Sequence, residues 1–324
     1  MKGESGSFNG SAEDYGSVPQ NAGSGPRKVF TKFEGISGAD AAKALGCTAV
    51  PPLIFMYVAS VMSFKLHFTA TTGVWLIALP GFIPALVMFS IKPPRFAGLA
   101  AMWPRVAAVL CSFAYLFASF FGELNYWYYS QPFFFLESLK TYSNIDPSQV
   151  SGVQLMDAGK VYFNEGARLG MDMAMSFTSW DTYCVAPITT GEGLPTQGAQ
   201  LVSYDLWAVG VNCCKSAEAN FRCGAYDDVN ARAGLRQVSA EQRAFFRLAV
   251  QQAEAAYNIQ ASNPTFFYWV KDPMLEESLF FQTSFENWVL ANAVHFALNA
   301  FCVMCFVMVF NTGSKDLRLS VLGA

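Results

Sequence analysis

The sequence predicts a membrane protein: a four-helix transmembrane bundle with an α+β domain, held by disulfides, between spans three and four outside the cytosol. Three observations lead to this fold class. Only 14% of the 324 residues are charged and 53% are hydrophobic, whereas about a quarter of a soluble domain is charged. Four long stretches contain no Asp, Glu, Lys or Arg. A long polar segment that contains four of the eight cysteines separates the last two stretches.

The four uncharged stretches are the predicted spans. They are residues 48–64, 73–91, 106–121 and 288–310. About 20 apolar residues cross the hydrocarbon core of a bilayer, and the third stretch reaches this length when its apolar neighbours are included. Pro80 and Pro84 are expected to kink the second span, because proline removes a helical hydrogen bond. The alternative, four buried helices of a large soluble protein, would require a core that covers all four.

The topology follows from the basic residues beside the spans, because Lys and Arg favour cytosolic loops. They cluster before span one, between spans two and three, and after span four, whereas the link between spans one and two offers only Lys65. We therefore expect both termini in the cytosol of a multi-pass protein of the plasma membrane or an endomembrane. The predicted parts are a disordered cytosolic tail (1–47), spans one to three (48–122), the extracytosolic domain (123–286), span four (287–311) and a cytosolic tail (312–324).

The extracytosolic domain is expected to begin with strands and to continue with a helix. Residues 160–163, 175–188 and 201–213 are rich in aromatic and β-branched side chains, which favour strands. Ser239 and Gln242 form a capping-box signal at the start of the helix. Two aromatic clusters, 125–135 and 266–269, have two interpretations: anchors at the membrane interface, or a ligand-binding aromatic surface.

The four cysteines of this domain, Cys184, Cys213, Cys214 and Cys223, predict two disulfides in an oxidising compartment. Adjacent cysteines rarely bond to each other, so Cys213 and Cys214 should each bond to one of the other two. Both arrangements remain open. A zinc site would favour paired C-x2-C spacing, and a thiol oxidoreductase would favour C-x-x-C; the domain has neither spacing and contains no histidine. We therefore expect no metal and no cofactor.

The fourth span carries a predicted polar face. Asn292, His295, Asn299 and Cys302 are spaced by three, four and three residues, which places them on one side of a helix. Polar side chains between membrane helices usually stabilise packing. The functional alternative is a hydrophilic pathway or a proton site centred on His295.

Other signals are few. "YGSV" offers Tyr15 and Val18 as a tyrosine-based sorting motif. No catalytic motif of the metalloprotease, phosphate-loop or nucleophile-elbow kind is present in the sequence, so we expect no catalytic residues. The net charge of −3 argues against nucleic acid as a partner.

Four short segments between spans three and four, "DAGKVYF", "YCVAPI", "WAVGVNCC" and "FRCG", carry a resemblance. In this order they resemble a family of uncharacterised four-span membrane proteins of dinoflagellate-type algae and related protists. The resemblance implies a disulfide-containing outer domain and no particular activity. The layout is also similar to that of the tetraspanins, although Lys215 follows the cysteine pair where that family has glycine.

The predicted function is that of a non-enzymatic integral membrane protein: a receptor, a scaffold or a subunit of a complex. Its partners would be the lipid bilayer, together with other membrane proteins or a ligand outside the cytosol. Two alternatives remain open: a transporter or channel subunit that uses the polar face of span four, and a membrane thiol oxidoreductase.

Overall fold

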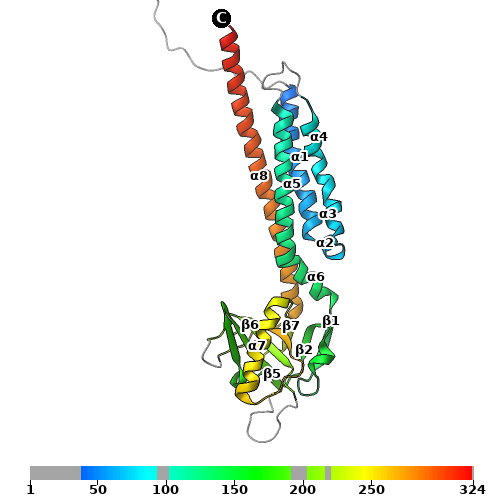
Figure 1. The fold of residues 1–324 in the computed structure, drawn as a ribbon, viewed down its shortest axis with the longest axis vertical. Helices are drawn as coiled ribbons and strands as arrows, with labels where there is room; N and C mark the ends of the chain where they lie inside the picture. The colour runs from blue at the N-terminus through cyan, green and yellow to red at the C-terminus, as the bar shows by residue number, and fades with distance from the viewer. Residues whose placement is uncertain (1–37, 93–101, 191–202, 216–219, 323–324) are drawn as a thin grey trace, which may run out of the picture. The chain divides into compact units, whose positions relative to one another are not determined.

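The structure, a computed structural model, describes residues 38–92, 102–190, 203–215 and 220–322. Ala42–Ala324 form one compact unit. Within it, a group of long helices and a sheet domain follow one another along the chain, and the last helix returns from the sheet domain to the group (Figure 1).

Four helical stretches in the described part of the chain are long and apolar enough to cross a membrane. They overlap the four predicted spans, and the third and fourth are longer than predicted. The stretches are Ala41–Ser63, Gly73–Ser90, Trp103–Ser138 and Pro273–Val309. The helices that form them are α1 (Gly38–Ser63), α3 (Gly73–Ala78) with α4 (Ile83–Ser90), α5 (Trp103–Asn125) with α6 (Gln131–Ser138), and α8 (Pro273–Leu322). A short helix, α2 (Lys65–Thr69), follows α1.

Two of these stretches depart from a regular α-helix. The 3-10 turn η1 (Leu79–Phe82) separates α3 from α4 where Pro80 and Pro84 predicted a kink. The π-helical turn η3 (Tyr126–Ser130) separates α5 from α6. The aromatic cluster 125–135 is therefore helical, and the first strand begins only at Lys140, well after the predicted start of the outer domain at 123.

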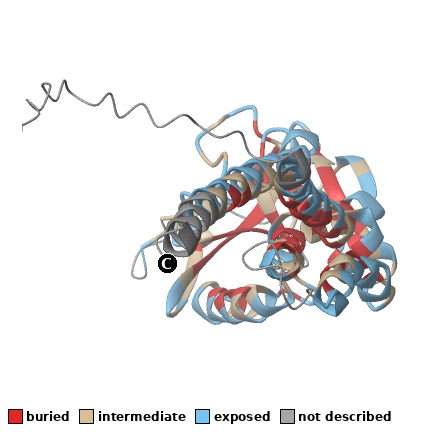
Figure 2. Ribbon diagram, turned by 90° about the horizontal axis from the view of Figure 1, so that it is seen from above, coloured by how far each residue is buried: buried red, intermediate tan, exposed pale blue. Residues whose placement is uncertain are grey.

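Small residues allow the helices to approach closely. The buried cluster between α1, α3, α4 and α5 contains Ala59, Ala78, Ala85, Ala114 and Ala118. A Cβ atom on Gly122 would lie 2.5 Å from the Cβ of Met62, so only glycine permits this contact between α5 and α1. Seen along the helices, buried residues face one another and exposed residues line the outside (Figure 2).

The sheet domain lies between α6 and α8 in the chain and contains an eight-stranded mixed sheet. The strand order is β1-β2-β7-β8-β6-β5-β3, and β4 pairs with β5. The strands are β1 (Lys140–Ile145), β2 (Ala158–Phe163), β3 (Ala167–Leu169), β4 (Met175–Ser179), β5 (Asp181–Thr190), β6 (Leu206–Val211), β7 (Ala233–Arg236) and β8 (Thr265–Val270).

Both faces of the sheet are covered, as the alternation of side chains along β6 shows. Trp207 and Val209 pack with the buried residues of helix α7 (Ala240–Tyr257). Leu206 and Ala208 point into a second core on the opposite face. Ser239 caps α7 as predicted, because its hydroxyl accepts a hydrogen bond from the backbone N–H of Gln242.

Strand β8 corrects the interpretation of the second aromatic cluster. Residues 266–269 are part of this strand, which lies between β7 and β6 near the middle of the sheet. Phe266, Phe267 and Trp269 are buried. The cluster is therefore neither a membrane anchor nor a ligand-binding surface, and both interpretations are wrong. The strands come first as predicted, because β1 to β7 precede α7, and of the described strands only β8 follows it.

Candidate binding surface

The two disulfides hold an irregular segment against the sheet. Cys184 of β5 bonds to Cys214, and Cys213 bonds to Cys223. This is one of the two arrangements that the sequence left open. Phe221, close to Cys223, is buried in the core on the face of the sheet opposite α7. The two disulfides therefore hold the segment that packs against this face.

The same sulfur atoms form the one group with metal-ligand geometry found among the described residues. The Sγ atoms of Cys184, Cys213 and Cys223 all lie within 4.8 Å of one another. All three are bonded in disulfides, however, and only a thiolate is a metal ligand or a nucleophile. Cys184 and Cys223 are also buried. The arrangement therefore suits a structural role.

Next to this disulfide cluster, the hairpin between β4 and β5 presents a tryptophan. Ser179 pairs with Asp181, so Trp180 is the single residue between the two strands. Its relative exposure is 104%, and its φ of 62° is left-handed. A bulky residue rarely adopts this conformation, which normally falls to Gly, Asn or Asp. A residue in this conformation costs about 1–3 kcal/mol, so the surrounding structure must hold the backbone at Trp180.

Asn212 fixes the end of this hairpin. Its backbone N–H donates to the Thr182 carbonyl over 2.7 Å, and its side-chain oxygen accepts from the Thr182 N–H over 2.9 Å. Its side-chain amide donates to the Asp181 carboxylate over 2.8 Å. Because Asn212 directly precedes the bonded Cys213, the disulfides and these three hydrogen bonds together hold the backbone that carries Trp180.

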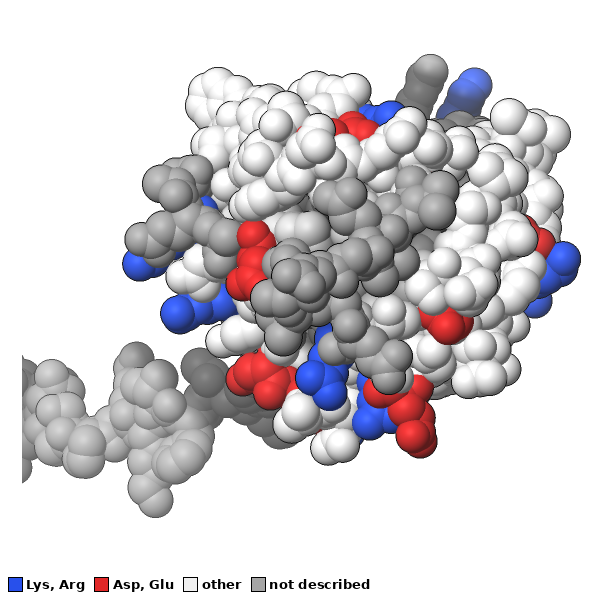
Figure 3. Space-filling model, turned by 90° about the horizontal axis from the view of Figure 1, so that it is seen from below, with Lys and Arg blue, Asp and Glu red and all other residues white. Residues whose placement is uncertain are grey.

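Polar residues lie at the end of the hairpin that carries Trp180. Thr178, Asp181 and Asn212 are all exposed there. On the face of the sheet domain that Figure 3 presents, acidic and basic side chains lie interspersed, without a patch of a single sign.

The polar face of α8 packs against α1. Asn299 is buried, and its side-chain amide donates to the carbonyl oxygens of Cys47 and Thr48, each over 3.1 Å. In a regular helix these two carbonyl oxygens would accept hydrogen bonds from the backbone N–H groups of residues 51 and 52. Both residues are proline, Pro51 and Pro52, and proline has no backbone N–H. Asn299 thus supplies the two hydrogen bonds that the proline pair removes from α1.

The other predicted members of this face have separate surroundings. His295 stacks on Phe55 of α1 with ring centroids 4.3 Å apart. Asn292 donates to the Trp288 carbonyl within its own helix. Cys302 is exposed, and Val303 takes the buried position beside it. The contacts of Asn299 and His295 are packing contacts between two helices.

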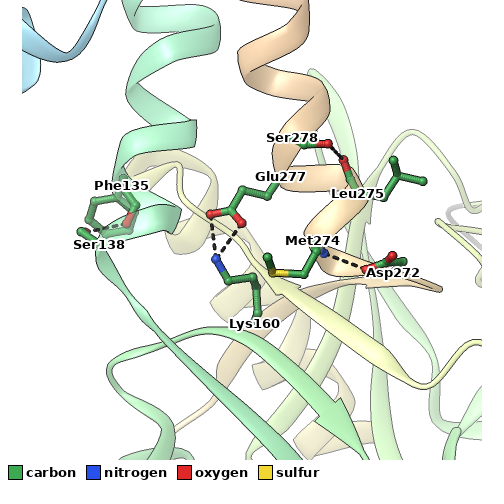
Figure 4. A network of polar contacts seen from close by, with 8 residues as sticks. All are labelled: Phe135, Ser138, Lys160, Asp272, Met274, Leu275, Glu277 and Ser278. Atoms are coloured by element: carbon green, nitrogen blue, oxygen red, sulfur yellow. Dashed lines mark hydrogen bonds and ion pairs between the residues drawn. The ribbon is translucent and has the colours of Figure 1, made fainter.

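A buried ion pair joins the sheet to the start of α8 (Figure 4). The Lys160 ammonium on β2 lies 2.8 Å and 2.6 Å from the two carboxylate oxygens of Glu277 on α8. The side chains are only 7% and 6% exposed. Asp272 caps this end of α8 by accepting a hydrogen bond from the Met274 N–H. The sheet domain and α8 are therefore fastened by charge as well as by apolar contact.

A second buried carboxylate, Asp205, orders the loops at the start of β6. It accepts hydrogen bonds from the Ser203 hydroxyl and from the backbone N–H groups of Asn263 and Gly152. Burial by itself would raise the pKa of Asp205, but these hydrogen bonds outweigh it, so the pKa lies below its ordinary value. The ionised carboxylate of Asp205 therefore stabilises these loops.

Sequence reasoning missed Trp180, Lys160 and Glu277. "TSWDT" offered one signal, because a tryptophan between Ser and Asp interrupts an otherwise strand-like run. No local signal pairs Lys160 with Glu277, since the contact depends on the path of α8. The predicted sorting residues Tyr15 and Val18 lie outside the described residues.

Comparison with known proteins gave no relatives. No protein-family model, no curated protein and no solved structure matches the chain.

Proposed function

We propose that the chain is a non-enzymatic multi-pass membrane protein whose sheet domain lies outside the cytosol and binds a protein partner through Trp180. The observation that carries the proposal is the fully exposed, left-handed Trp180 at the end of the β4–β5 hairpin. Tryptophan is the residue most enriched among interface hot spots. Holding its ring in water on a strained backbone is unfavourable without a compensating role.

The membrane part of the proposal rests on the four apolar helices and on the basic residues at their ends. Both termini lie in the cytosol in this arrangement. The two disulfides support an oxidising compartment for the sheet domain, because disulfides rarely persist in the cytosol.

The rigid attachment of the hairpin supports binding rather than catalysis. Asn212 and the disulfides limit the backbone freedom around Trp180, so little conformational entropy is lost when a partner covers the ring. Such a domain fits a receptor, a scaffold or a complex subunit.

The experiment is photo-crosslinking in intact cells that express the full chain. A photoreactive residue at Thr178, beside Trp180, should give a discrete protein adduct. Trp180→Gly should abolish the adduct, because glycine tolerates the left-handed backbone and removes only the side chain. Val229→Gly, at another exposed apolar position of the sheet domain, is the matched control and should leave the adduct unchanged. An adduct that persists in Trp180→Gly, or one formed only with lipid, would overturn the proposal.

A further inference from the structure

Strand β4 lies at an edge of the sheet. β5 pairs with β6 along one side and with β4 along the other, and β4 has no further partner among the described strands. An edge strand leaves a row of backbone N–H and C=O groups unpaired. No backbone group of another described segment bonds to β4 on its outer side. This edge is therefore open to a strand from outside the chain.

The register between the strands shows which groups of β4 point outward. The carbonyl oxygen of Thr182 on β5 accepts a hydrogen bond from the backbone N–H of the residue that follows β6, so the backbone groups of Thr182 point toward β6. Backbone groups alternate between the two sides of an antiparallel strand. Those of Tyr183 therefore point toward β4 and face Phe177, the residue opposite. It follows that the N–H and C=O groups of Ser176 and Thr178 point away from the sheet.

The edge at the other end of the sheet is protected against added strands, whereas β4 is not. On β1, Lys140 is exposed, Asn144 has a left-handed φ of 57°, and the register with β2 shifts twice. Charged side chains and bulges are common protections of edge strands. β4, with the sequence "MSFTS", has no charge and no proline, and its register with β5 is regular.

A row of half-buried apolar side chains runs beside this open edge. Met175 and Phe177 pack with the core under α7, where the Phe177 ring stacks on Phe245 of α7 with centroids 6.2 Å apart. All three side chains are only partly buried. Ser176 and Thr178 alternate with them along β4 and face the other side of the sheet. A strand beside β4 would therefore cover apolar groups on one face and meet hydroxyl groups on the other.

We infer that the protein partner bound by Trp180 adds a strand to the outer edge of β4. The occupant is an extended segment of that partner, with apolar and polar side chains in alternation. Main-chain hydrogen bonds provide affinity in this mode of binding, and the side chains along the edge provide specificity. Trp180 directly follows β4, so the edge and the ring form one continuous surface. The inference rests on the proposed function, since both concern the same partner.

The experiment maps photo-crosslinks in intact cells that express the full chain. A photoreactive residue replaces Ser176 in one variant and Thr178 in another. These side chains lie on the same face of β4, and a paired strand has the same repeat, so the attachment points on the partner should lie about two residues apart within one segment. Attachment to unrelated segments of the partner, to lipid or to a second copy of this chain would overturn the inference.

A proline variant tests the backbone hydrogen bonds directly. Ser176→Pro, with the photoreactive residue at Thr178, removes an outward N–H and no hydrogen bond of the sheet, so most of the adduct should be lost. Ser176→Ala keeps the N–H and should retain the adduct. An adduct that survives Ser176→Pro but is lost in Trp180→Gly would overturn strand pairing and leave binding through Trp180 intact. If Ser176→Pro fails to fold, the spacing of the attachment points still decides.

Discussion

Large apolar side chains are buried in the sheet domain but exposed on the apolar helices. In the sheet domain, Trp207, Phe221, Phe246 and Phe267 are among the largest fully buried side chains of the chain. On the helices, side chains such as Leu76, Leu116 and Phe120 are exposed on the outside. Only 11% of the 18 most apolar consecutive residues of α8 are buried. The same kind of residue therefore faces inward in one region and outward in the other.

The polar groups are also arranged differently in the two regions. Asp205 of the sheet domain is buried and bonds to several loops. On the helices, Asn299 instead donates hydrogen bonds to two backbone carbonyl oxygens of α1. This difference supports the proposal that the apolar helices meet lipid, where every backbone group must find a partner inside the protein.

The largest effect is expected where the two regions meet. Lys160→Met leaves the Glu277 carboxylate buried without a counter-ion, and breaking a buried ion pair costs about 3–5 kcal/mol of unfolding free energy. Lys160→Met with Glu277→Met should recover most of that loss, because no charge remains unpaired. Denaturant unfolding of the full chain in detergent, followed by aromatic circular dichroism, measures both variants. An equal loss of unfolding free energy in the single and double variants would show that the cost does not come from leaving the Glu277 charge unpaired.

The disulfides should stabilise the sheet domain alone. The Cys184–Cys214 bond spans 30 residues and the Cys213–Cys223 bond spans 10. Loop-entropy estimates give about 3.6 kcal/mol for the longer and about 2.7 kcal/mol for the shorter. Replacing each pair by alanine should lower the unfolding transition of the sheet domain, including α7, in that order and leave the unfolding of the apolar helices unchanged. A lower unfolding transition of the apolar helices would contradict the separation of the two regions.

Loss of the two hydrogen bonds from Asn299 to α1 should destabilise the chain less, and the size of the loss should depend on the two prolines of α1. Asn299→Leu leaves two carbonyl oxygens without donors, which we expect to cost about 2 kcal/mol of helix association. In a chain that already carries Pro51→Ala and Pro52→Ala, the backbone N–H groups return and the same substitution should cost much less. Thermal unfolding in detergent measures this double-mutant cycle. If Asn299→Leu costs the same with and without the prolines, Asn299 does not act through the carbonyl groups that the prolines leave without donors.

Acid should weaken the sheet domain through Asp205. The folded-state pKa of Asp205 lies below its ordinary value, so the group stabilises the fold above about pH 4, the value of an unfolded aspartate, and loses this contribution as the pH falls further. Asp205→Asn should cost about 1 kcal/mol near neutral pH. The difference between native chain and variant should shrink toward about pH 2. A constant difference across this range would rule out the ionised carboxylate as the cause.

The parts of the fold that the sequence predicted are those set by local composition. Spans follow from uncharged stretches, and Ser239 marks the start of α7 by itself. β8 was misread because an aromatic run looks the same in a sheet core and at a membrane interface. The packing role of Asn299 was predicted, but its partner, the proline pair of α1, could not be, because it lies far along the chain.

Labelling of two engineered cysteines tests most directly whether the two regions meet different solvents. Val229→Cys in the sheet domain and Leu290→Cys on α8 replace side chains that are 90% and 62% exposed. Both are placed in a chain whose free cysteines, Cys47, Cys111, Cys302 and Cys305, are alanine. In native membranes a water-soluble maleimide should label Val229→Cys readily and Leu290→Cys only after denaturation. Equal labelling of both positions in intact membranes would contradict the proposal that α8 crosses a bilayer.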